Sequence, residues 1–197
     1  MATQTTQPHK NGQGGGFAMD LDAIRNRARK HIEQGAVTES YGADTETVCQ
    51  VLNEVLATEI VCFLRYKRHA IMAPRVAGIE GEAIMNELST HADEESQHAD
   101  RVATRIVQLG GQPNYDPKDL PSRAHAQYVA GETLEEMLTE DLVAERIAIE
   151  TYSEIVRFLG NSDPTSRRMM EEILAVEEEH ADDLADWLHK IGAVQRP

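Results

Sequence analysis

Four long segments of this chain carry apolar residues at spacings of three and four, which is the period of one face of an α-helix. They cover approximately residues 45–72, 80–109, 133–159 and 163–192. Three of these segments begin with residues typical of helix starts: Asp44, the capping box from Thr133 to Glu136, and Asp163 followed by a proline. No segment shows the alternating pattern of a strand. The sequence therefore predicts an all-α protein.

The connections between the segments predict how the helices pack. Residues 74–79 and 160–163 form short loops, so the first and second helices, and the third and fourth, should form antiparallel hairpins. The first helix should end before Pro74, because proline interrupts helices. Residues 112–131 instead form a proline-containing connection long enough to recross a bundle of about 40 Å. We therefore expect a four-helix bundle with one long crossover between helices two and three.

The chain is predicted to divide into this bundle and an N-terminal tail. Residues 45–197 should form the bundle, and residues 1–44 a tail that is disordered to residue 18 and holds one short helix over residues 20–34. That helix contains the basic cluster Arg25 to Lys30, in a chain of net charge −15. So acidic a chain is a poor binder of DNA, which is held mainly by Lys and Arg at its phosphates. No signal peptide is evident, and no apolar run approaches the roughly 20 residues of a membrane span. A cytoplasmic protein without membrane contact is expected.

Each predicted helix has a glutamate within its apolar stripe, near the helix midpoint. These glutamates are Glu59, Glu95, Glu145 and Glu177, and histidines follow one turn later at His98 and His180. Four carboxylates meeting at one level of an apolar core would be very costly unless they were protonated or neutralised. Two divalent cations would balance their charge. Oxygen and imidazole ligands without thiolate suit iron or manganese, although zinc also occupies such sites.

The order of these residues is repeated along the chain. Residues 95–100 and 177–182 both have the sequence Glu-x-x-His-Ala-Asp, and residues 56–66 and 142–152 both have Leu-x-x-Glu-x6-Tyr. In Glu-x-x-His the two side chains lie one turn apart on one helix face, so the glutamate can bridge two metals while the histidine binds one of them. A chance Glu-x-x-His is common, but surface salt bridges would not require this internal two-fold repeat. The repeat therefore predicts a dinuclear metal site.

Other residues on the same stripes are weaker candidates. Tyr66 follows Glu59 by two turns, and it could supply an electron or a hydrogen bond to the metals, or simply pack in the core. Tyr152 is interpreted as a core or interface aromatic residue, and His69 and His91 as core or interface histidines with satisfied hydrogen bonds. Cys62, about one turn beyond Glu59, could be redox-sensitive, but inert packing is the expectation.

With these motifs, the sequence resembles the bacterioferritins and the related Dps-like ferritins over roughly residues 45–191. The segments that carry the resemblance are LNEVLATEIVCFLRYKRHA, EESQHADRVATRI, LTEDLVAERIAIETY and EEEHADDLADWL. The resemblance implies a ferritin-like bundle that oxidises Fe(II) to Fe(III) with dioxygen or hydrogen peroxide, for iron storage or detoxification. It implies two iron ions per chain, held by Glu59 and Glu145 as terminal ligands, Glu95 and Glu177 as bridging ligands, and the imidazoles of His98 and His180.

The sequence departs from the family pattern at three points. Ser96 stands where bacterioferritins carry the haem-ligating methionine, so no haem is expected. An acidic residue often precedes each bridging glutamate; Glu94 keeps this feature but Val176 does not, and Glu94 is predicted to orient the imidazole of His180. The short stretch after His180 leaves little room for a fifth helix, which favours a homo-oligomeric shell of twelve subunits over one of twenty-four.

Three alternative functions remain open from the sequence. A di-manganese catalase uses a similar ligand set, although such proteins are usually longer. A di-iron peroxidase of the rubrerythrin kind normally carries a Cys-x-x-Cys iron site, which is missing from this sequence. A Dps-type DNA-protecting protein would use the basic cluster Arg25 to Lys30 as an arm, against the charge of the whole chain.

Overall fold

The computed structural model describes residues 18–193, and these residues form helices, turns and loops without a strand. The α-helices are α1 (Leu21–Arg27), α2 (Thr45–Val76), α3 (Gly81–Gln108), α4 (Leu120–Arg123), α5 (Leu134–Leu159) and α6 (Pro164–Lys190). Two short 3-10 turns, Ile32–Gln34 and Gly78–Glu80, complete the elements. The disorder expected for residues 1–18 falls, except for residue 18, outside the described residues, as does the end of the chain beyond residue 193.

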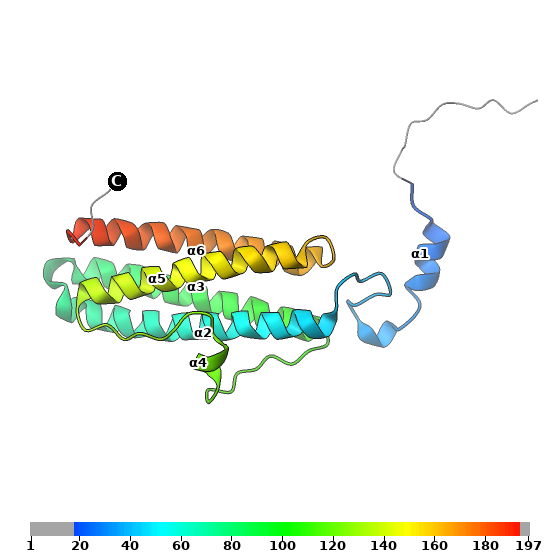
Figure 1. The fold of residues 1–197 in the computed structure, drawn as a ribbon, viewed down its shortest axis with the longest axis horizontal. Helices are drawn as coiled ribbons and strands as arrows, with labels where there is room; N and C mark the ends of the chain where they lie inside the picture. Colours follow the sequence, from blue (N-terminus) through cyan, green and yellow to red (C-terminus); the bar gives the residue numbers. More distant parts are fainter. Residues whose placement is uncertain (1–17, 194–197) are drawn as a thin grey trace, which may run out of the picture.

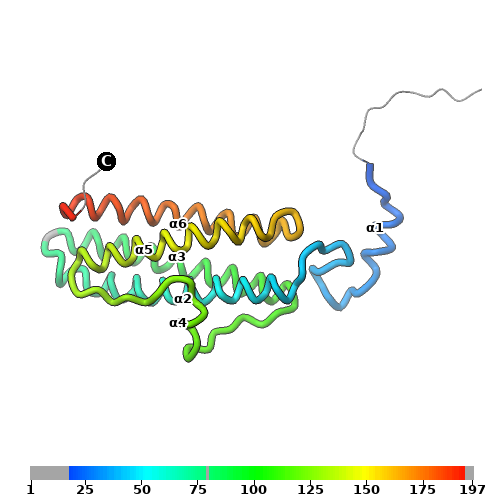
Figure 2. Tube along the Cα trace, viewed as in Figure 1, coloured from blue at the N-terminus to red at the C-terminus, as the bar shows by residue number. Residues whose placement is uncertain are grey.

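Helices α2, α3, α5 and α6 form a four-helix bundle (Figure 1). α2 and α3 make one antiparallel hairpin, and α5 and α6 make the other. The crossover between them returns along α2 and includes the short helix α4 (Figure 2). The all-α fold and the single long crossover between the second and third bundle helices are therefore confirmed.

Helix starts follow the sequence signals closely. The side chain of Asp44 accepts a hydrogen bond from the Thr47 amide at 3.0 Å, and Thr133 and Glu136 form the predicted capping box. The end of the first bundle helix was predicted wrongly, because α2 continues through Pro74 to Val76. Proline removes one helical hydrogen bond there, and the burial of Ala73 in the core stabilises this last turn.

The N-terminal helix is shorter than predicted. α1 ends at Arg27, and His31 adopts a left-handed conformation with φ of 51° before a 3-10 turn, so residues 20–34 are not one helix. α1 lies off the end of the bundle, and none of its residues is buried (Figure 1).

A buried polar group attaches the segment before α2 to the bundle. Asp163, at the start of α6, accepts hydrogen bonds from Arg105 Nη2 at 2.9 Å, from the Ser166 amide at 2.9 Å and from the Tyr41 hydroxyl at 2.6 Å. Burial alone would raise the pKa of Asp163, but the hydrogen bonds from Ser166 and Tyr41 and the charge of Arg105 outweigh it, so the pKa is lowered.

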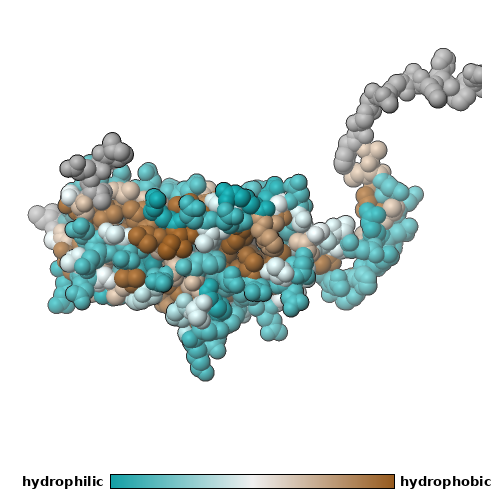
Figure 3. Space-filling view, in the orientation of Figure 1, coloured by the Kyte–Doolittle hydropathy of each residue, from teal (hydrophilic) through white to brown (hydrophobic). Residues whose placement is uncertain are grey.

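The apolar core consists of two main clusters with a polar layer between them. One contains Leu52 and Leu56 of α2 and Ile106 of α3; the other contains Leu88 of α3 and Leu184 of α6. The midpoints of the four long helices lie between these clusters. On the face drawn in Figure 3, hydrophilic residues surround apolar patches that follow the length of the bundle. Among the exposed apolar residues, Val143 and Phe158 of α5 are 44% and 55% exposed.

One helix is long and apolar enough to cross a membrane by length and composition. This is α2, so the expectation that no segment approaches a membrane span is wrong for this helix. More than half of its apolar window is buried in the bundle. A core helix of a four-helix bundle passes the same test, and α2 also carries the buried charged groups Glu59 and Arg65.

Candidate metal centre

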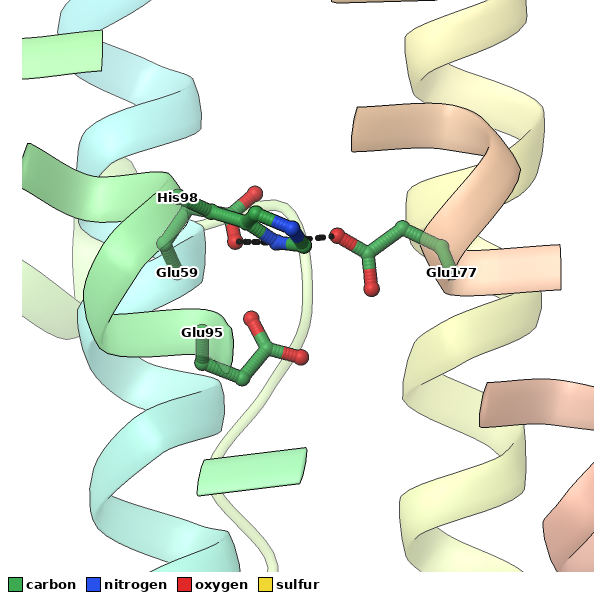
Figure 4. A group of neighbouring side chains, drawn as sticks. All are labelled: Glu59, Glu95, His98 and Glu177. Atoms are coloured by element: carbon green, nitrogen blue, oxygen red, sulfur yellow. Dashed lines mark hydrogen bonds and ion pairs between the residues drawn. The ribbon is translucent and has the colours of Figure 1, made fainter. Parts of the chain in front are cut away.

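The six predicted ligands meet in the polar layer at the middle of the bundle. They form two groups of four: Glu59, Glu95, His98 and Glu177 in one, and Glu95, Glu145, Glu177 and His180 in the other. Within each group the ligand atoms lie within 4.8 Å of one another. Figure 4 shows the first group, with α2 and α3 supplying its residues on one side and α6 supplying Glu177 on the other. Glu95 and Glu177 belong to both groups, as bridging residues would.

Both histidines turn the Nδ1 atom toward the carboxylates. His98 Nδ1 lies 3.2 Å from Glu59 Oε2 and 3.1 Å from Glu177 Oε1. His180 Nδ1 lies 3.4 Å from Glu177 Oε2 and 3.6 Å from Glu95 Oε1. Glu177 thus lies between the two imidazoles.

Several buried atoms of this layer lack hydrogen-bond partners among the described residues. They are Glu95 Oε1, Glu145 Oε2, His180 Nδ1 and both carboxylate oxygens of Glu177, which contact the imidazoles of His98 and His180 only as ion pairs. A buried polar atom without a partner is costly, and such atoms are rare in folded proteins. Here all of these atoms belong to one cluster of oxygen and nitrogen atoms that could ligate a metal. The donor set therefore fits a pair of divalent cations, which would occupy these lone pairs.

Burial and mutual repulsion dominate the electrostatics of the carboxylates. Burial, and then the charges of Glu177 and Glu59, raise the pKa of Glu95 well above its usual range. Burial and the charge of Glu177 raise the pKa of Glu145 in the same way. Burial also opposes the ionisation of Glu177, but contacts with His180 and His98 outweigh it and lower the pKa to about 2.

The two imidazoles of the centre are stabilised in their charged form. Burial favours neutral rings, but Glu177 and Glu59 outweigh it at His98 and raise the pKa to about 10. Glu177 and Glu94 likewise raise the pKa of His180. Protons therefore neutralise part of the negative charge of this layer, and cations would have to displace them.

Two tyrosines connect opposite helices through the outer carboxylates. Tyr66 of α2 donates a hydrogen bond to Glu145 Oε1 of α5, and Tyr152 of α5 donates one to Glu59 Oε1 of α2. Burial raises the pKa of both phenols well above the usual range, so both remain donors. Tyr66 thus lies beside the centre, hydrogen-bonded to Glu145. Tyr152 also lies there, although the sequence analysis interpreted it as a core or interface residue. The repeated Leu-x-x-Glu-x6-Tyr motif was the signal that could have identified this position.

Glu94 contacts the centre from its rim. Its Oε2 lies 2.8 Å from His180 Nε2, on the side of the ring opposite Nδ1, which faces Glu177 and Glu95. The side chain of Glu94 is 40% exposed, whereas that of His180 is 2% exposed. The predicted contact between Glu94 and His180 is therefore present in the structure.

The other two stripe histidines differ from each other. His69 has both ring nitrogens bonded, Nδ1 to Asp141 Oδ2 and Nε2 to the Ala130 carbonyl, each at 2.8 Å, as predicted. The prediction was wrong for His91, because its buried Nδ1 has no hydrogen-bond partner within the described chain. Burial, followed by repulsion from His180, lowers the pKa of His91 to about 4.

A buried ion pair beside the centre was missed by sequence reasoning. Arg65 Nε donates to Asp141 Oδ1 at 2.7 Å, and both side chains are at most 1% exposed. Arg65 also donates to the Gln127 carbonyl at 3.1 Å, which attaches the crossover to α2. No sequence motif marks this pair, because its members come from separate helices.

An all-α bundle with one long crossover and two overlapping Glu/His groups at its centre defines the ferritin-like class of proteins. The profile of the family described as "Ferritin-like domain" matches residues 49–194, about three quarters of the sequence. The chain therefore belongs to the ferritin-like family.

Curated relatives carry two kinds of name. The chain is 31% identical over 147 residues to the DNA protection during starvation protein of Pyrococcus furiosus, covering 73% of this chain and 78% of that protein. It is 31% identical over 146 residues to bacterioferritin BfrA of Mycobacterium tuberculosis, covering 72% and 83%, respectively.

Solved structures show the same arrangement. A dodecameric thioferritin, the bacterioferritin-related protein from Bacteroides fragilis, superimposes with a TM-score of 0.72 at 32% identity over 77% of this chain and 90% of that one. Dps from Thermosynechococcus elongatus gives a TM-score of 0.68 at 21% identity over 73% and 90%, a likeness of fold alone.

Proposed function

We propose that this protein oxidises Fe(II) at the centre and stores or detoxifies the ferric product. The observation that carries the proposal is the pair of overlapping ligand groups that share Glu95 and Glu177, with buried lone pairs unpartnered in the described chain. The name bacterioferritin among the relatives supports an iron-storage role.

In this proposal each residue type has a distinct task. Glu95 and Glu177 bridge the two ions, and His98 and His180 each bind one. Glu59 and Glu145 are terminal ligands, held in place by the hydroxyls of Tyr152 and Tyr66. Ser96, beside Glu95, has no atom suited to ligate haem, so the site is proposed to work without it.

The proposed reaction moves two electrons from two iron ions. Each Fe(II) loses one electron, and dioxygen takes both together with two protons to become hydrogen peroxide. With hydrogen peroxide as the oxidant, the same two electrons and two protons yield two water molecules. The two acceptors therefore differ in whether peroxide accumulates or is consumed.

Storage requires that the ferric product be enclosed. A single bundle has no interior for a mineral, so we propose a closed homo-oligomeric shell with symmetric interfaces. The Bacteroides fragilis relative is described as dodecameric, which supports twelve subunits over twenty-four. Twelve chains of 21.9 kDa would form a particle of about 260 kDa, and twenty-four one of about 530 kDa, which light scattering distinguishes.

DNA protection is not favoured by the arrangement of the basic cluster. Arg25 is paired with Asp22 at 3.1 Å, and Lys30 with Glu39 at 2.9 Å, so neighbouring carboxylates neutralise half of its four cations.

We also propose that the protein acts in the cytoplasm. The two cysteines of the chain, Cys49 and Cys62, are buried and form no disulfide, as is usual in a reducing environment.

The experiment is anaerobic loading with Fe(II), followed by separate additions of dioxygen and hydrogen peroxide. We expect two Fe(II) per chain to be oxidised rapidly and further iron to form a soluble mineral inside the particle. Manganese binding with rapid disproportionation of peroxide would instead indicate a catalase. A chain that oxidises iron but never assembles would remove the storage role.

A further inference from the structure

A second group of side chains that could bind a metal lies on α3 and α6, about one helical turn from the centre. Glu87 and His91 of α3 and Asp183 of α6 have ligand atoms within 4.8 Å of one another. None of the three belongs to the six residues of the centre. His91 lies four residues, about one turn, before Glu95, and Asp183 lies three residues after His180.

The spacing of these atoms suits a shared cation better than hydrogen bonds. His91 Nε2 lies 3.6 Å from Asp183 Oδ2 and 3.8 Å from Glu87 Oε1, which is longer than a hydrogen bond. Two ligand atoms that bind one ion at about 2.0–2.2 Å lie about 3 to 4 Å apart. The three side chains therefore need only small movements to close around one ion.

The imidazole of His91 is buried and packed between other rings, but one of its nitrogen atoms has no hydrogen-bond partner among the described residues. Its side chain is 2% exposed, and Nδ1 has no hydrogen-bond partner among the residues that the structure describes. The ring stacks on His180 with 4.1 Å between centroids and meets the edge of Tyr66 at 5.3 Å. By contrast, His69 has both nitrogens bonded. Packing fixes the His91 ring with Nε2 toward two carboxylates, an arrangement that a purely structural histidine does not require.

The group lies between solvent and the centre. The side chains of Glu87 and Asp183 are 39% and 43% exposed, so an ion can reach them from water. His91 touches His180, which belongs to the buried centre. The two carboxylates, His91 and His180 therefore follow one another from the surface to the buried centre.

We propose that Glu87, His91 and Asp183 bind one additional divalent transition-metal ion at the mouth of the centre. One imidazole and two carboxylates leave further positions open for water, and the two carboxylates balance the charge of the ion. This donor set suits Fe(II), Mn(II), Co(II) or Zn(II). The ion's role as the next one to enter the centre rests on the proposed function, whereas its binding does not.

The test is anaerobic equilibrium binding of Co(II) to the full-length assembled protein, with metal counted per chain. We expect three Co(II) per chain in the wild type and two in the Glu87→Gln/Asp183→Asn variant. The matched control is Glu82→Gln/Asp182→Asn, which removes the same charge from exposed positions of the same helices and should still bind three. His91 is left unchanged because its ring packs on His180. Circular dichroism and particle size verify that each variant folds and assembles.

A second variant separates this proposal from the proposed function. Glu95→Gln/Glu177→Gln should lose the two ions of the centre and retain one, which disappears when the Glu87 and Asp183 substitutions are added. A crystal soaked in Co(II) should show the anomalous peak of the third ion beside His91 Nε2. An equal number of ions per chain in the wild type and in the Glu87→Gln/Asp183→Asn variant would overturn the proposal. One ion in the wild type that only the Glu87 and Asp183 substitutions remove would support this site and refute the dinuclear centre.

Discussion

Glu94 offers the sharpest test of how the protein tunes its proposed metal centre. Its carboxylate lies 2.8 Å from the outer nitrogen of His180, whose inner nitrogen faces Glu177 and Glu95. The acceptor fixes the proton on Nε2 and leaves Nδ1 free to bind metal. Glu94→Ala removes both the acceptor and its charge, whereas Glu94→Gln keeps an acceptor without charge.

The size of the effect follows from the exposure of Glu94. Partners of metal-bound histidines commonly change metal affinity 10- to 100-fold, or about 1.4 to 2.7 kcal/mol. Because Glu94 is 40% exposed, water can replace part of its contact, and the lower end of this range applies. We expect Glu94→Ala to weaken binding of the ion held by His180 about 10-fold. Glu94→Gln should have a smaller effect in the same direction.

The assay is anaerobic Co(II) titration followed by visible absorption, combined with NMR titration of His180 in the metal-free protein. Burial favours the neutral ring, and Glu177 and then Glu94 raise its pKa, so Glu94→Ala should lower the pKa of His180. A merely structural role would not move this pKa in that direction. The control is Asp93→Asn, which removes the same charge one residue away from a side chain that is 69% exposed and pairs with Lys67.

Two results would refute this reasoning. One is an affinity for Co(II) in Glu94→Ala within two-fold of the wild type. The other is an equal loss in Asp93→Asn, which would show that only the general charge of the rim matters.

Four further predictions concern the centre, its protons, the fold and DNA. Glu95→Ala or Glu177→Ala should abolish rapid Fe(II) oxidation in stopped-flow absorption. Glu95→Ala should nevertheless not destabilise the metal-free protein in thermal unfolding, because it removes a buried carboxyl whose Oε1 has no hydrogen-bond partner among the described residues. The pKa of about 10 at His98 means that this ring carries a proton near neutral pH, and burial with the charges of Glu177 and Glu59 also raises the pKa of Glu95. Metal binding should therefore release protons and weaken as the pH falls from 8 to 6, which calorimetry in several buffers would measure. Asp163→Asn should lower the free energy of unfolding at pH 7 by about 3 kcal/mol, because it leaves the buried guanidinium of Arg105 without a charged partner. Because the pKa of Asp163 is lowered in the folded protein, the difference in unfolding free energy between wild type and variant should shrink as the pH falls below about 4. Denaturant unfolding at several pH values would measure it. The basic cluster at residues 25–30 should give no gel shift with DNA at about 150 mM salt, and a shift that survives would contradict the expectation that so acidic a chain binds DNA poorly.

The sequence by itself determined the number of long bundle helices and the composition of the candidate centre. Helix periodicity and caps such as Asp44 and Thr133 are local signals, so they survive without knowledge of the packing. The six residues proposed as ligands were identifiable because each lies on the apolar stripe of its own helix, where burying a charged or polar group is costly unless a partner compensates it. The order of glutamates and histidines repeats along the chain, which made their meeting at one level predictable.

Only the tertiary structure decided the contacts that depend on which faces meet. Tyr152 donates a hydrogen bond to Glu59 because α5 packs against α2. The same packing of α5 on α2 brings Arg65 and Asp141 together as an ion pair. Sequence spacing along one helix carries no information about register between two helices. The same limit applies to His69 and His91, for which the sequence supported the same interpretation. Packing against the crossover satisfies the first, whereas packing against His180 leaves the second buried, unsatisfied and facing two carboxylates.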